Sequence, residues 1–130
     1  QSPDSINAID WRRKMEHADV FAYYKGLIQL RKNHPAFRLG DADLVRRHLE
    51  FLPLEGSNVV AYHLKENAGG DAWGDIYVIL NSRKEIAKVP VPEGRYTVVC
   101  KDGFISEQGL GTIYGPEVFV PAQSALIFYK

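Results

Sequence analysis

Carboxylates are the side chains of this chain with the most potential for acid–base chemistry, and two of them stand close together. Asp71 lies inside segment 67–74, which contains three glycines, and Asp75 follows it directly. Two carboxyl groups that face each other can act as general acid and as base or nucleophile. A glycine-rich segment also forms solvated turns with no chemical role, and we favour that interpretation. Asp41 and Asp43 are better explained as helix-capping residues.

Other common signatures of catalysis and of metal binding do not occur. The four histidines form no His-x-x-x-His pair, and the single cysteine, Cys100, rules out a Cys-x-x-Cys motif. We therefore expect no metal site and no cofactor. No Gly-x-Ser-x-Gly elbow is present. Gly109 and Gly111 lack the helix and the spacing of a phosphate-binding loop, so we expect a β-turn or a bulge there.

The two tryptophans are the remaining candidates for ligand contact. Trp11 and Trp73 both lie among polar residues, where an indole ring can stack on the apolar face of a ligand. For Trp73 the competing interpretation is an anchor that fastens its loop to the core. For Trp11 it is packing against a neighbouring part of a larger protein. We favour packing in both cases and keep ligand contact as the alternative.

Charge and hydropathy exclude two classes of partner. The chain carries 16 basic and 16 acidic residues, with no block of like charge. A nucleic-acid-binding surface requires a basic stripe, and none is visible. No apolar run approaches the roughly 20 residues that cross a bilayer. We expect neither a nucleic acid nor a membrane as partner. The chain begins with Gln rather than Met, which suggests a piece of a longer protein and leaves the compartment unknown.

Helical periodicity dominates the first part of the chain. Apolar residues recur at helical spacing over 19–34, and Pro35 ends this pattern. A second short helix is expected over 41–47, with Asp41 as its cap. The 19–34 helix carries three aromatic rings on a broad apolar face. This face could lie on the β domain, be covered by a partner or by a second copy in a dimer, or stay partly exposed.

Strand-like patterns replace the helical ones from about residue 48. The clearest apolar runs are 59–64, 76–80, 95–100 and 125–129, and a tight hairpin turn is expected at 101–103. About seven or eight such strands at short intervals are typical of an antiparallel β-sandwich. The predicted fold is therefore mainly β, with a helical segment over 1–39 and a sandwich domain over 40–130.

Several stretches of the chain resemble one enzyme family. They include Asn-x-Ile-Asp-Trp (7–11), Leu-Arg-Lys-x-His-Pro-Ala-Phe (30–37), Gly-Asp-Ala-Trp (70–73) and the strand-like run 76–81. Together they closely resemble the last barrel segment and the C-terminal domain of type I pullulanases, which are glycoside hydrolases of the α-amylase clan. The resemblance covers essentially the whole chain. The spacing of its first motif is more particular to pullulanases, whereas the second motif is shared across much of the clan.

This resemblance implies that catalysis and structural support are carried out by different parts of a longer parent enzyme. The parent would hydrolyse α-1,6-glucosidic linkages in pullulan, starch or glycogen with a (β/α)₈ barrel. Its three catalytic carboxylates would lie upstream, so we expect no catalysis from this piece. Residues 1–39 would be the helical tail of the barrel. The barrel would be the partner of the sandwich domain 40–130, which would act as its structural support.

The resemblance also selects the residues that could touch substrate. The stretch 2–11 is similar to a loop that borders the substrate cleft of the family, so the candidate contacts to an α-glucan are Asn7, Asp10 and Trp11. Asp10 could instead cap a helical turn or pair with a neighbouring arginine, which we favour. The alternative function for the whole piece is a carbohydrate-binding module that contacts α-glucan through Trp73.

Overall fold

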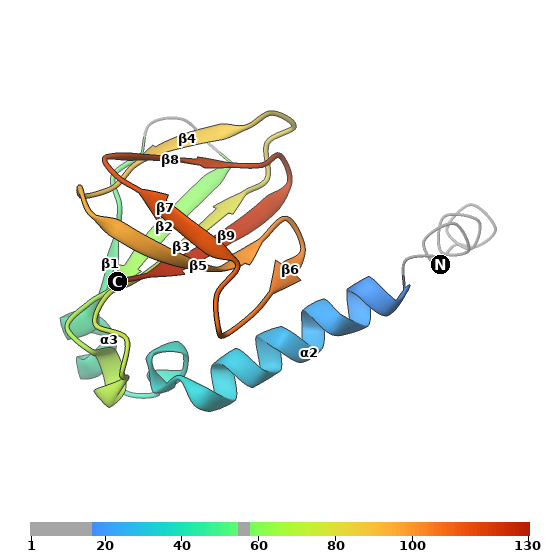
Figure 1. The fold of residues 1–130 in the computed structure, drawn as a ribbon. Coiled ribbons are helices and arrows are strands. Elements are labelled where there is room, and N and C mark those ends of the chain that lie inside the picture. Colours follow the sequence, from blue (N-terminus) through green and yellow to red (C-terminus); the bar gives the residue numbers. More distant parts are fainter. Residues whose placement is uncertain (1–16, 55–57) are drawn as a thin grey trace, which may run out of the picture.

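Helices come first and strands follow in the computed structural model, which describes residues 17–54 and 58–130 (Figure 1). The helical elements are α2 (His17–Asn33), the 3₁₀ turn η1 (Pro35–Arg38), α3 (Ala42–His48) and the 3₁₀ turn η2 (Ala68–Gly70). The strands are β1 (Leu49–Phe51), β2 (Val59–Leu64), β3 (Ile76–Asn81), β4 (Ala87–Pro90), β5 (Arg95–Lys101), β6 (Phe104–Ile105), β7 (Gly111–Tyr114), β8 (Glu117–Val120) and β9 (Ser124–Tyr129). The predicted mainly β fold with a preceding helical segment is confirmed.

Local chemistry explains where the two α-helices begin and end. Helix α2 ends at Asn33, and His34 is extended with φ −127° and ψ 99°, because the following Pro35 disfavours the α region. The guanidinium of Arg38 then donates from Nε to the carbonyl oxygen of Arg31 at 2.8 Å, which satisfies one of the last helical carbonyls. Asp41 caps α3 as predicted, since its Oδ1 accepts from the backbone N–H of Asp43 at 2.7 Å.

Seven strands form one antiparallel sheet in the order β1-β2-β3-β9-β5-β6, and β7 also pairs with β5. Strands β4 and β8 form a separate two-stranded sheet. Strand β3 lies in the middle of the large sheet and pairs with β2 and β9 over its whole length, as its continuous apolar run predicts. Strand β7 is not predicted by the sequence pattern. Only Ile113 among its four residues is partly buried, so it shows no alternation of apolar and polar residues.

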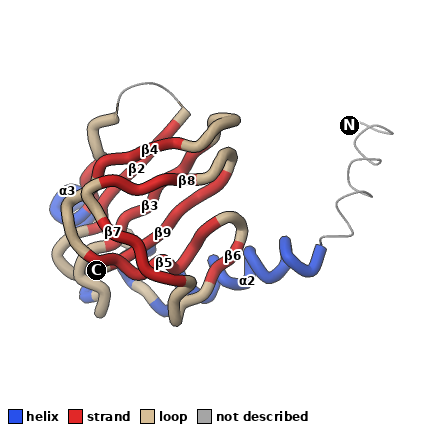
Figure 2. The backbone as a smooth tube through the Cα atoms, turned by 45° about the horizontal axis from the view of Figure 1, so that its top comes forward, coloured by secondary structure: helices blue, strands red, loops and turns tan. Residues whose placement is uncertain are grey.

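The large sheet has a core on each face. The first core lies between this sheet and the β4–β8 pair and is built around residues such as Tyr77, Tyr96, Val120 and Phe128. The second core lies between the opposite face and the helical elements and includes Leu30, Ala36, Leu64, Ile76, Val78, Val99, Cys100 and Ile127. Figures 1 and 2 show the resulting layers, with β4 and β8 on one side and the helices on the other. Because β3 contributes side chains to both cores, it is apolar at nearly every position.

Helix α2 comes very close to β6 at Gly26. A Cβ atom added to Gly26 would lie 2.8 Å from Cβ of Ile105 and 2.9 Å from its Cγ2. A glycine inside a helix costs about 0.5–1 kcal/mol relative to alanine. The absence of a side chain at this position therefore has a packing reason, since it lets the helix lie directly on β6.

We expect Gly26→Ala to lower the free energy of unfolding by about 1–3 kcal/mol, because α2 or Ile105 must shift to admit the methyl group. The matched control is Gly40→Ala, where an added Cβ meets no atom within 4 Å. Its effect should stay within about 0.5 kcal/mol. Urea denaturation followed by circular dichroism measures both. A Gly26→Ala variant at least as stable as the wild type would contradict the close packing.

Candidate functional site

The loop that precedes β3 is shaped by Asn67. This residue adopts the left-handed conformation with φ 52° and ψ 53°, which asparagine tolerates better than most residues. Its backbone N–H donates to the carbonyl oxygen of Gly74 at 2.9 Å, and its side-chain amide donates to the carbonyl oxygen of Asp71, also at 2.9 Å. These two bonds close the loop on itself. Asp71 and Trp73 then reach residues at the end of α2 and in η1.

Asp71 is a buried acceptor of several hydrogen bonds. Its side chain has an exposed fraction of 0%. Its Oδ1 accepts from the backbone N–H of Trp73 and lies 2.9 Å from Nδ1 of His34, and its Oδ2 accepts from the backbone N–H of Ala36 at 3.1 Å. The predicted solvated turn is therefore wrong for Asp71, because its loop folds back onto η1. Asp75 is 40% exposed and binds a different histidine, since its Oδ1 lies 2.7 Å from Nε2 of His63.

His34 lies between two carboxylates. Its second ring nitrogen, Nε2, is 2.7 Å from Oε2 of Glu107, while Nδ1 faces Asp71. The other carboxylate oxygen of Glu107 accepts from the side-chain amide of Asn33 at 3.0 Å. An imidazole donates from both nitrogens only when it carries its second proton. These contacts join the end of α2 to the loop before β3 and to the loop between β6 and β7.

Trp73 is enclosed by aromatic rings. The His34 ring lies 3.6 Å from the indole centroid at an interplanar angle of 24°, and the Tyr129 ring lies 4.1 Å away at 5°. Two rings this close to the indole and nearly parallel to it would overlap if they shared one face, so they cover opposite faces. The residue is half-buried. This geometry is that of a loop anchor. We call His34, Asp71, Trp73 and Glu107 the His34 cluster.

The pKa of Glu107 is lowered by its neighbours. The hydrogen bond from Asn33 has the largest effect, burial opposes it, and the hydrogen bond and charge of His34 lower the pKa further. A carboxyl group whose pKa is lower in the folded than in the unfolded state stabilises the fold at pH values above the unfolded pKa. This stabilisation is lost as the pH falls through the folded pKa.

We therefore expect Glu107→Gln to reduce the loss of stability on acidification. The free energy of unfolding of the wild type should fall more steeply with decreasing pH than that of the variant, and urea denaturation at a series of pH values measures this difference. Glu117→Gln is the control, because Glu117 is an exposed residue whose carboxylate lies 3.8 Å from Lys88. If the free energy of unfolding fell equally steeply with decreasing pH for the wild type and for Glu107→Gln, the role given to this carboxylate would be contradicted.

Of the predicted contact residues, Asn7, Asp10 and Trp11 lie outside the described residues, and Trp73 lies in the His34 cluster. Sequence reasoning did not select His34 or Glu107, which are 73 positions apart. The signals available for His34 were its position between a helix end and a proline and its place in the motif over 30–37, whereas Glu107 had none. Within 17–54 and 58–130, no group of three or more His, Cys, Asp or Glu side chains is placed to hold a metal ion. No described helix is long and apolar enough to cross a membrane.

Comparison with known proteins places this architecture in a family. Residues 45–103 match the family described as "Pullulanase, all-beta domain". The pullulanase of Bacillus subtilis (strain 168) is 36% identical over 125 residues, which cover 87% of this chain and 17% of the relative. In the solved pullulanase from Bacillus acidopullulyticus, the similar region has 41% identity and a TM-score of 0.83, and it covers 98% of this chain and 15% of that one. The type I pullulanase of Bacillus subtilis complexed with maltose has 35% identity and a TM-score of 0.78, with coverages of 99% and 18%.

The fold is thus a β-sandwich domain with a helical segment on one outer face. The chain contains the all-beta domain of pullulanases, and the resemblance predicted from its sequence is confirmed. It spans only 15% and 18% of the two solved relatives.

Proposed function

We propose that this chain is the non-catalytic C-terminal piece of a pullulanase-type debranching enzyme, in which the β-sandwich supports the catalytic barrel. The parent would hydrolyse α-1,6-glucosidic linkages in pullulan, starch or glycogen. Residues 1–39 would form the helical tail of the barrel, and residues 40–130 would form the sandwich domain. The observation that carries this proposal is the His34 cluster, which joins the end of α2 to two loops of the sandwich.

The cluster supports the proposal because it makes a rigid joint. His34 follows α2 directly, and its ring is held by two carboxylates and by the face of Trp73. Leu30 and Ala36, both within the proposed helical tail, are also buried in the second core of the sandwich. The C-terminal end of α2 is thus attached to the sandwich by hydrogen bonds and by packing. A barrel that contained this helix would therefore be braced by the β domain.

The burial and the hydrogen bonds of Asp71 and Asp75 argue against catalysis by this piece. Glycoside hydrolysis needs two carboxyl groups that flank the scissile bond, about 5–10 Å apart. Asp71 is completely buried and accepts hydrogen bonds on both oxygens, so it cannot reach a substrate. Its neighbour Asp75 is bound to His63.

The enclosure of Trp73 weighs against the alternative function, a carbohydrate-binding module. A sugar stacks on the face of an aromatic ring, and both faces of this indole are covered by His34 and Tyr129. Titration of the chain with millimolar maltotetraose should leave its tryptophan fluorescence unchanged. A saturable change that disappears in Trp73→Phe would favour the binding module.

A truncation and a chimaera test the supporting role. The truncation removes from Bacillus subtilis pullulanase only the part aligned with residues 40–130. In the chimaera, this chain replaces the whole matched segment. We expect the truncated enzyme to lose pullulan hydrolysis and thermal stability, and the chimaera to retain both. Full activity and an unchanged melting temperature in the truncated enzyme would contradict the proposal. Pullulan hydrolysis by the isolated 130-residue chain would contradict the proposal that this piece is non-catalytic.

A further inference from the structure

The end of α2 is attached to the sandwich by two carboxylates that differ in their freedom to move. Asp71 is fully buried, and its oxygens accept from the backbone N–H groups of Trp73 and Ala36 in addition to facing Nδ1 of His34. Glu107 faces Nε2 of the same ring at 2.7 Å, and its side chain is 30% exposed. The side chain of Glu107 can therefore turn towards water, whereas Asp71 is fixed in its site.

Both contacts are hydrogen bonds only if the His34 ring carries its second proton. A neutral imidazole has one N–H and one lone pair, so one of the carboxylates would then face another acceptor. The Trp73 indole favours the charged ring, because an aromatic face attracts a cation and the two ring centroids are 3.6 Å apart. Glu107 suits the same state, since the hydrogen bond from Asn33 and then the contact with His34 lower the pKa of its carboxyl group.

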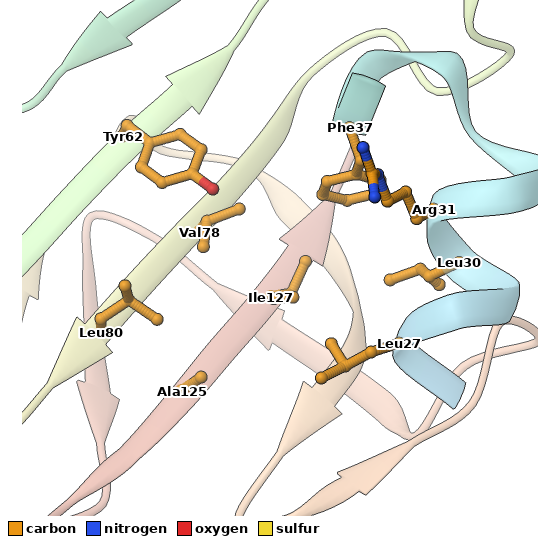
Figure 3. Close-up of a pocket in the computed structure, with 9 residues that line it drawn as sticks. All are labelled: Leu27, Leu30, Arg31, Phe37, Tyr62, Val78, Leu80, Ala125 and Ile127. Atoms are coloured by element: carbon orange, nitrogen blue, oxygen red, sulfur yellow. The ribbon is translucent and has the colours of Figure 1, made fainter. Parts of the chain in front are cut away.

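The arginines next to His34 in the sequence make their contacts elsewhere. Arg38 of η1 donates from Nε to the carbonyl oxygen of Arg31. Arg31 itself lines an apolar groove between α2 and the sheet, beside Phe37 (Figure 3). Lys32 is exposed, and Phe37 meets the His34 ring edge-on with centroids 6.5 Å apart. Among the described residues, the charged groups paired with His34 are thus the two carboxylates.

Loss of the second proton changes the two contacts unequally. The remaining N–H stays on Nδ1, because Asp71 is buried and cannot exchange this donor for water. The lone pair of Nε2 then faces the carboxylate of Glu107 at 2.7 Å, which is repulsive. We propose that Glu107 is a pH-sensitive latch, which binds the end of α2 while His34 is charged and releases it when His34 becomes neutral.

The release is confined to the contact between the helix and one loop. The loop that carries Glu107 stays on the sheet, because the backbone N–H of Leu110 donates to the carbonyl oxygen of Val98 on β5. The bond from Asn33 to Glu107 is lost with the latch, whereas the contact of the ring with Asp71 is kept. Resting on the proposed function, the pH would thereby set how firmly the β domain holds the helical tail of the barrel.

The latch stabilises the fold on the acidic side of the histidine range. A histidine that gains a carboxylate partner on folding contributes stability while its ring is charged, and this contribution is lost as the pH rises and the ring loses its proton. Histidine side chains change charge between about pH 5 and pH 8. We therefore expect the latch to be closed at the lower end of this range and to open as the pH rises through it.

Nitrogen NMR of the 130-residue chain measures the charge of the ring directly. The resonances of His34 are identified by their absence from the spectrum of His34→Gln. We expect both ring nitrogens to be protonated at about pH 5, and Nε2 to lose its proton as the pH rises. A ring that is neutral at about pH 5, or one that keeps its last proton on Nε2, would overturn the proposal.

Thermal unfolding measures the contribution of the latch to stability. Between about pH 5 and pH 8, the melting temperature of the wild type should fall by several degrees more than that of Glu107→Gln, because an amide can either donate to Nε2 or accept from it. Glu117→Gln is the matched control and should follow the wild type, since Glu117 lies near Lys88 on the other sheet. In a His34→Gln background, Glu107→Gln should no longer alter the pH dependence.

Equal changes of melting temperature in the wild type and in Glu107→Gln would overturn the latch. An effect of Glu107→Gln that persists in the His34→Gln background would also overturn it, because another titrating group would then be responsible. The truncation of Bacillus subtilis pullulanase separates the latch from the proposed function. If truncation harms the enzyme and the latch tests fail, only the supporting role stands. If the latch tests succeed and truncation is harmless, the latch stands as a property of this chain and the supporting role fails.

Discussion

Replacing Asp71 by alanine is expected to lower the free energy of unfolding by about 3–5 kcal/mol, because each buried polar group left without its hydrogen-bond partner costs about 1–3 kcal/mol. The Asp71 side chain is fully buried and holds the backbone N–H groups of Ala36 and Trp73 as well as the His34 ring. Without the carboxylate, the backbone N–H groups of Ala36 and Trp73 and the Nδ1 atom of His34 would lose their hydrogen-bond partner. Urea unfolding followed by circular dichroism and by tryptophan fluorescence measures the loss.

Asp75→Ala is the control for this prediction, because it removes the same side chain from the same loop. Asp75 is 40% exposed and makes a single bond of 2.7 Å to His63. Its loss should cost only about 0.5–1.5 kcal/mol. Asp71→Asn keeps one acceptor oxygen and should fall between the two alanine variants. Equal losses for Asp71→Ala and Asp75→Ala would show that the buried network contributes no more than an exposed pair.

Trp73→Ala is expected to lower the free energy of unfolding by about 2–4 kcal/mol, somewhat less than for a fully buried tryptophan because Trp73 is half-buried. The substitution removes the ring that lies between His34 and Tyr129, and it leaves a cavity beside the second core. Trp73→Phe should cost much less, since a phenyl ring can keep part of the stacking. Thermal and urea unfolding of both variants measure the difference.

Phe104→Ala provides the control for aromatic loss at an exposed position. Phe104 is 62% exposed, and its removal should change stability by no more than about 0.5 kcal/mol. If Trp73→Ala were as mild as Phe104→Ala, the indole would not act as an anchor, and a role in ligand contact would again become the simpler explanation.

Elements with a strong local signal were predictable. Pro35 fixes the end of α2, and the continuous apolar run of β3 marks a strand covered on both faces. The hairpin between β5 and β6 follows from its two turn residues, since Asp102 and Gly103 both have positive φ, at 53° and 85°. Strand β7 was missed because its residues are mostly exposed. Its position depends on pairing with β5 and not on its own pattern.

The sequence by itself determined the order of helices and strands, the lack of a recognisable metal-binding motif and the resemblance to pullulanases. Each of these depends on residue types within a short window. Only the tertiary structure decided which loop carboxylate is buried. Asp71 and Asp75 have similar neighbours, yet Asp71 contacts His34, which lies 37 positions before it. His34 in turn contacts Glu107, which lies 73 positions after His34. The same holds for Trp73, whose two faces are covered by residues distant in sequence, because burial is set by contacts between elements that local composition does not encode.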